Sequence, residues 1–148
     1  MLLALQALVV AFLWLHDWVP LGRLNDVAAV RSQDTLPRLI GVTIVQSVPW
    51  SIGLIFSAAY FGHSYPHWLR MWLWGSYIFL VLGVIRAWWV PYFLGADARR
   101  LTRYRIMFGN THSFLPERNG MVPNTAHILL LLAGIATLVV LFAWDFKV

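Results

Sequence analysis

The sequence contains no cysteine, which excludes disulfide bonds, thiolate metal sites and cysteine nucleophiles. Acidic residues are also scarce: the chain has six, and they form no paired-carboxylate motif. A glycine-rich phosphate loop, a nucleophile elbow and a His-Glu-x-x-His sequence are all absent. The sequence therefore favours a role without catalysis, although a small membrane-embedded enzyme that acts on lipid stays an alternative.

Charge of either sign is sparse. Charged residues make up 11% of the chain, whereas a soluble domain usually contains about 25%. Hydrophobic residues make up 60%, and the mean hydropathy is +0.69. A folded surface with so little charge requires lipid as its solvent. The net charge of +5 does not indicate nucleic acid, because the basic residues lie between long apolar runs rather than on one polar face.

Four apolar segments are long enough to cross the hydrocarbon core of a bilayer, which requires about 20 helical residues. Their hydrophobicity is continuous rather than alternating, so helices are predicted and a β-barrel is not. Many of the nine tryptophans fall near the ends of these segments, where aromatic rings prefer the headgroup layer. The sequence predicts an all-α, integral membrane four-helix bundle in a single domain, 1–148. The predicted spans are 2–19, 39–61, 68–94 and 125–144.

Arginine is distributed unequally between the two sides of this bundle. The two loops on one side hold eight arginines, whereas the terminal side holds Arg70 and Lys147. Short loops rich in basic residues stay in the cytosol. We therefore expect both termini outside (N-out, C-out), in the cell membrane and in particular a bacterial inner membrane. The eight arginines are Arg23, Arg31, Arg38, Arg99, Arg100, Arg103, Arg105 and Arg118.

The two arginine-rich loops are long enough to form short surface helices. Residues 24–32 could form two helical turns, and residues 96–108 mix basic with apolar side chains. A basic amphipathic segment suits an anionic membrane interface. We therefore predict short cytosolic amphipathic helices, with anionic headgroups bound along the Arg99–Arg105 segment.

Polar residues inside the spans are costly in lipid and mark candidate sites. Arg86 lies in the third span, on one helix face with Gly83, which suggests that it points into the bundle. The alternative is that its long side chain extends to the headgroups. Gln46 lies at a similar depth in the second span, near Thr43 and before Pro49. A proline there frees a backbone carbonyl and could create a polar pocket.

The cytosolic ends of the first and fourth spans carry further polar residues, and Asp17 shares a helix face that could bring it to Arg86. Together these residues predict a cytosol-facing vestibule. Because a guanidinium offers paired donors, the vestibule suits a small anionic or amphiphilic ligand. The predicted ligand-binding residues are Arg86, Gln46, Asp17, His16, Thr43 and His127.

Histidines raise two cofactor alternatives. His16 and His127 could ligate haem between two helices. His63, His67 and Asp145 have the residue types of a zinc site, although the two histidines lie in a loop that enters a helix. We expect neither cofactor, because these histidines follow no metal-binding motif.

The size and the four predicted spans are similar to those of small multidrug transporters. Those proteins carry a membrane-embedded glutamate in their first span, and this chain has no glutamate before Glu117. The similarity does not extend to that site, and the prediction rests on the polar vestibule: a module that binds or transports a small anionic or amphiphilic ligand. The alternative is an accessory or structural subunit without ligand chemistry. In either case we expect a homo-oligomer or a partner membrane subunit.

Overall fold

The computed structural model describes the backbone from Met1 to Asp145 and the side chains from Met1 to Trp144. Within this part of the chain all regular elements are helices, and an isolated β-bridge joins Arg118 to Met121. The predicted all-α class is therefore confirmed. The elements in chain order are α1 (Leu2–Leu15), η1 (Gly22–Leu24), α2 (Val27–Gln33), α3 (Leu36–Ala59), α4 (His67–Val84), η2 (Ile85–Trp89), α5 (Val90–Leu94), α6 (Ala98–Phe108) and α7 (Thr125–Asp145).

Three helices are long and apolar enough to cross a membrane: Leu36–Ala59, the continuous helix His67–Leu94, and Thr125–Trp144. They coincide closely with three of the four predicted spans. Between 28% and 39% of the most apolar window of each is buried inside the chain. The remaining apolar surface faces outward, which is compatible with a membrane location.

The first predicted span, 2–19, is wrong at its end, because α1 stops at Leu15. A helix of 14 residues is about 21 Å long at 1.5 Å per residue, shorter than the hydrocarbon core of about 30 Å. After Leu15 the chain turns, and the amide of Asn25 bonds the carbonyls of His16 and Val19 at 2.5 and 2.8 Å. These bonds satisfy carbonyls that a continuing helix would have used.

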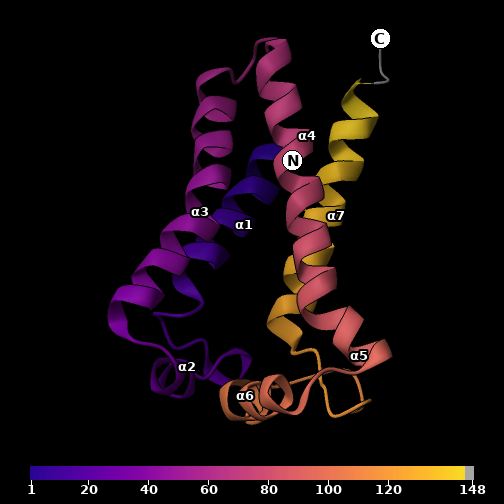
Figure 1. Cartoon of the computed structure of the whole chain (residues 1–148). Helices are drawn as coiled ribbons and strands as arrows, with labels where there is room; N and C mark the ends of the chain where they lie inside the picture. Colours follow the sequence, from indigo (N-terminus) through magenta and orange to yellow (C-terminus); the bar gives the residue numbers. More distant parts are fainter. Residues whose placement is uncertain (146–148) are drawn as a thin grey trace.

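Helices α3 and α4 are joined by a short loop at one end and diverge toward the other, where α2 and α6 lie across the bundle (Figure 1). Near the joined end, Gly53 allows close approach: a Cβ atom there would lie 3.0 Å from Leu73 Cδ2. The Trp72 indole also donates to the Pro49 carbonyl at 2.9 Å. Further along α4, Gly134 of α7 packs against Val81 in the same way, where a Cβ atom would lie 3.1 Å from Val81 Cγ2. Small residues at helix contacts are typical of membrane bundles.

A π-helical turn, η2, interrupts the long helix His67–Leu94 before Pro91. Proline has no N–H, so the carbonyl of Ala87, four residues earlier, loses its helical donor. Two side chains of α6 replace it: the Tyr104 hydroxyl donates to this carbonyl at 3.0 Å and Arg100 Nη2 donates at 2.8 Å. The proline therefore explains both the irregular turn and the attachment of α6 beneath it.

The two predicted surface helices are present as α2 and α6. Each begins at an aspartate whose side chain caps it: Asp26 accepts from the Ala29 amide and Asp97 from the Arg100 amide, both at 2.9 Å. The α6 arginines also bind the protein itself. Arg100 holds the Ala87 carbonyl, while Arg103 and Arg105 pair with acidic residues. Contact of this segment with anionic headgroups stays a prediction.

Candidate functional site: a cleft between α3 and α4

The polar residues of α3 mainly tie this helix to α1. The indole N–H of Trp18 donates to Thr43 Oγ1 and that of Trp14 donates to Ser51 Oγ, both at 2.9 Å. Gln46 Nε2 donates to the Leu13 carbonyl at 3.3 Å. Polar groups in an apolar setting require such partners. Thr43 is therefore held by the turn that follows α1, which is a structural role.

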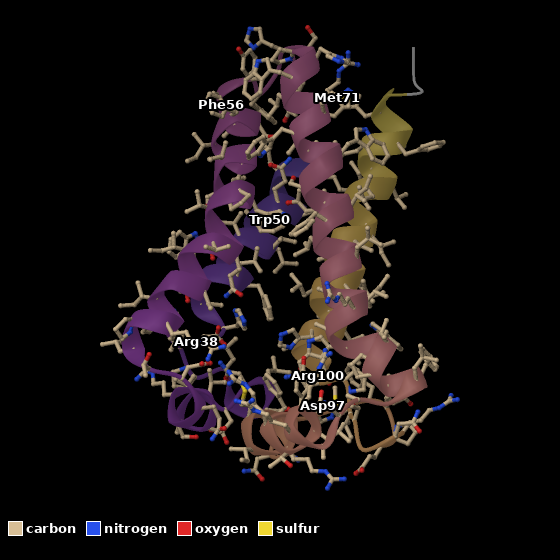
Figure 2. The ribbon with its side chains drawn as sticks, in the orientation of Figure 1. Arg38, Trp50, Phe56, Met71, Asp97 and Arg100 are labelled. Carbon is tan, nitrogen blue, oxygen red and sulfur yellow. The ribbon has the colours of Figure 1, made fainter. Side chains whose placement is uncertain are left out.

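Where α3 and α4 diverge they enclose an upper cavity of about 240 Å³. Its walls come from α1, α3, α4, η2 and α7, and most of its lining atoms belong to apolar or aromatic side chains. Figure 2 shows Trp50 in this space between α3 and α4. The lining residues are Leu13, His16, Gln46, Trp50, Phe79, Leu80, Gly83, Val84, Ala87, Trp88, His127 and Leu130.

A lower cavity of about 310 Å³ lies between these helices and α6. It shares the lining residues Ala87, Trp88 and His127 with the upper cavity, so the two cavities are adjacent, and we call them together the α3/α4 cleft. The lower part differs in chemistry because it contains charged side chains of both signs. Its lining residues are Asp17, Val30, Asp34, Arg38, Leu39, Val42, Ala87, Trp88, Arg103, Tyr104, Met107, Phe108 and His127.

Aromatic rings surround the junction of the two cavities. The His127 ring lies 4.4 Å from the Trp88 ring and 5.7 Å from the Phe108 ring, between centroids. The His16 ring stacks on Phe12 at 4.5 Å and meets His127 edge to face at 5.8 Å. The predicted proximity of the two histidines is therefore present, and the rings of η2 and α6 complete the junction.

Hydrogen bonds orient both histidines. His16 Nδ1 lies 2.9 Å from the Phe12 carbonyl, and His127 Nδ1 lies 2.6 Å from Asn124 Oδ1, with the amide nitrogen of Asn124 directed to the Leu24 carbonyl. A carbonyl oxygen only accepts, so each Nδ1 carries the proton in the neutral ring. Each Nε2 is then an acceptor. His16 Nε2 lies 3.4 Å from Asp17 Oδ1, so two acceptors face one another.

A three-residue charge cluster lines the lower cavity. Asp34 has a side chain that is 9% exposed, and its two oxygens bind two arginines. Arg38 Nε lies 3.2 Å from Oδ1, and Arg103 Nη2 lies 2.6 Å from Oδ2. Arg38 lies in the first turn of α3, at the end of the bundle where α3 and α4 diverge (Figure 2). Each guanidinium keeps further N–H donors, since arginine has five.

Four of the six predicted site residues line the α3/α4 cleft, and two do not. His16, Gln46, Asp17 and His127 are in its walls. Thr43 is held by Trp18, and Arg86 has an exposed side chain outside the lining of both cavities. The π-helical turn explains the position of Arg86, because its extra residue per turn makes Ala87 continue the cleft face of Gly83.

Sequence reasoning missed the charge cluster and the aromatic junction. Arg38 was predicted only as a topological charge, Arg103 as part of a segment that binds anionic headgroups, and Asp34 was not considered. The i, i+4 spacing of Asp34 and Arg38 is a signal that could have indicated their ion pair. Arg103 lies 69 residues from Asp34 in the chain, and no sequence pattern joins them.

The zinc alternative receives no support from geometry. His63 and His67 are both exposed. The side chain of Asp145 lies outside the residues that the structure describes. Among the described side chains, no group of three histidine or acidic residues is arranged to hold a metal ion.

The geometry of the cleft can be compared with known proteins. No family model, no curated protein and no solved structure matches this chain. The residues of the cleft are therefore the guide to its function.

Proposed function

We propose that this protein binds an amphiphilic, lipid-like molecule in the α3/α4 cleft. The observation that carries the proposal is the change of chemistry between two adjacent cavities that share Ala87, Trp88 and His127. The upper cavity is lined mainly by apolar and aromatic side chains, and the lower cavity carries Asp17, Asp34, Arg38 and Arg103. An acyl chain matches the first environment, and a polar headgroup matches the second.

Entry from the bilayer is favoured by the residues at the edge of the upper cavity. Phe79 lines this cavity and is 71% exposed, so the space reaches the outer surface of α4. Gly83 also lines it and presents no side chain. An acyl chain could therefore enter between α3 and α4 without crossing a polar barrier.

Binding is a better match to the cleft than transport across the membrane. Toward the joined end, α3 and α4 approach closely at Gly53 and are tied by the Trp72–Pro49 hydrogen bond. A transported molecule would need a second opening there. We therefore propose a binding role, in which the ligand enters and leaves on the side where the helices diverge.

Filling the cleft at Gly83 is expected to abolish ligand entry. Gly83 lines the cavity and a Cβ atom there would meet nothing within 4 Å, so we expect the side chain of Gly83→Leu to occupy part of the cavity. Gly75→Leu is the matched control, because Gly75 lies on the same helix, also has open space, and lies outside the cleft. The probe is a phosphatidylethanolamine with a photoreactive acyl chain.

Cross-link yields at two residues of α3 distinguish a probe bound in the cleft from a probe in the surrounding lipid. Trp50 is 6% exposed and lines the cavity, whereas Val45 is 74% exposed and lies on the outer surface. We expect Gly83→Leu to lower the yield at Trp50 by about tenfold, equivalent to about 1.4 kcal/mol of binding, with no change at Val45. Equal yields at Trp50 in the wild type, Gly83→Leu and Gly75→Leu would show that no acyl chain occupies the cleft.

We also propose that the end with α2 and α6 faces the cytosol of a bacterial inner membrane, because the loops there hold eight arginines. The absence of native cysteines allows a direct test. A membrane-impermeant maleimide added to intact cells should label Ser64→Cys in the α3–α4 loop and leave Glu117→Cys unlabelled until the cells are opened. Both native side chains are exposed. The reverse labelling pattern would contradict this orientation.

A further inference from the structure

We propose that the headgroup bound in the lower cavity is zwitterionic, with a protonated amine held at Asp17 and a phosphate held at Arg38 and Arg103. The ligand class is then an aminophospholipid of the phosphatidylethanolamine type. This inference rests on the proposed function and adds the identity of the headgroup to it.

The amine site is the pair of facing acceptors at the junction of the cavities. In the neutral ring, His16 Nε2 has a lone pair and lies 3.4 Å from Asp17 Oδ1. Two acceptors at this distance require a shared proton donor, supplied by protonation of His16 or by an N–H group placed beside both. The side chains are 10% and 15% exposed, so little water reaches them. A primary ammonium offers three such donors.

Aromatic side chains add to the attraction for a cation. Trp88 and Phe108 line the lower cavity with Asp17, and their ring centroids are 4.8 Å apart. The face of an aromatic ring carries negative charge density and attracts ammonium groups. His127 lines the same space, and its Nε2 is a further acceptor in the neutral ring.

The phosphate site is the pair of arginines that share Asp34. Both arginines line the lower cavity, and one carboxylate neutralises only one of their two positive charges. The cluster therefore keeps a net charge of +1 with unused N–H donors. A phosphodiester carries one negative charge and accepts from such donors in the geometry that arginine favours.

Charge balance favours a ligand that carries both signs. The lower cavity holds Asp17 and Asp34 against Arg38 and Arg103, so its formal charge is zero before the ligand binds. An anionic lipid would satisfy the arginines and leave Asp17 without a cation, and an amine without phosphate would do the reverse. A zwitterion satisfies both, and its primary ammonium can donate where the trimethylammonium of phosphatidylcholine cannot.

The test is displacement of the photoreactive phosphatidylethanolamine from Trp50. The competitors are phosphatidylethanolamine, phosphatidylcholine and phosphatidylglycerol with identical acyl chains. We expect phosphatidylethanolamine to displace the probe at about tenfold lower concentration than either of the others, as the loss of one charged hydrogen bond implies. In Asp17→Asn this advantage should disappear while displacement by phosphatidylglycerol stays unchanged.

Glu117→Gln is the charge-matched control. It removes one negative charge at the same end of the bundle, from a residue outside the cleft that pairs with Arg105. It should keep the wild-type order of the three lipids. If Asp17→Asn does not fold, the wild-type order decides alone: equal or tighter binding of phosphatidylglycerol or phosphatidylcholine overturns the inference. A Trp50 cross-link insensitive to Gly83→Leu would instead overturn the proposed function.

Discussion

Replacing Trp88 by alanine is expected to lower the free energy of unfolding by about 3–5 kcal/mol, the range found for large aromatic side chains removed from a core. Trp88 is 3% exposed, and its ring meets three others on two different helices. The ring centroids of Tyr104, Phe108 and His127 lie 4.9, 4.8 and 4.4 Å from it. Its loss would therefore weaken the packing of η2 against both α6 and α7.

Trp89→Ala is the matched control for this experiment. Trp89 follows directly in η2, is only partly buried, and its ring contacts are with Tyr92 and Phe93 of the adjoining α5. Its removal should cost about 1 kcal/mol, the central value for single substitutions. Unfolding in mixed micelles with increasing SDS, followed by circular dichroism, measures both variants. Equal losses for the two tryptophans would contradict the central role of Trp88.

The same two tryptophans show why the helices could be predicted and the site could not. Hydropathy alone locates α3, the helix His67–Leu94 and α7, because each is a continuous apolar run of spanning length. It does not distinguish Trp88 from Trp89, since both suit an interface. Burial of Trp88 depends on α6, which follows a turn and folds back beneath the bundle.

The sequence predicts that a proline inside a helix frees a backbone carbonyl, but not which freed carbonyl gains new hydrogen-bond donors. Both Pro49 and Pro91 remove a helical hydrogen bond. A polar pocket is predicted near Pro49, but the acceptor with two new side-chain donors is the Ala87 carbonyl, freed by Pro91. The donors Arg100 and Tyr104 lie 13 and 17 residues from Ala87, on another helix. Helical periodicity within one segment therefore could not predict their contact with Ala87. The π-helical turn at this point also explains why Arg86, for which both an inward and an outward orientation were open, lies outside the lining of both cavities.

Neutralising Asp34 is the second substitution with a large expected effect. Asp34→Asn removes the charge from a side chain that is 9% exposed and binds Arg38 and Arg103. Loss of a charged hydrogen bond costs about 1.5–3 kcal/mol, and the partly exposed arginines can regain water, so we expect a loss near the lower end of this range. The same SDS titration measures it. The aspartate joins the end of α2 and the start of α3 to α6, so these elements should loosen together.

A double-mutant cycle separates the two arginines on this carboxylate. Arg103 is 36% exposed, lies 2.6 Å from Oδ2 and comes from a distant helix, whereas Arg38 is 65% exposed and lies 3.2 Å from Oδ1. We expect a coupling free energy of about 1–2 kcal/mol between Asp34→Asn and Arg103→Gln. For Arg38→Gln the coupling should be about 0.3–0.5 kcal/mol, as for exposed i, i+4 pairs. A larger coupling for Arg38 would mean that Asp34 mainly stabilises the first turn of α3 through its ion pair with Arg38. In that case α6 would be held in place by Arg100, Tyr104 and Trp88 instead.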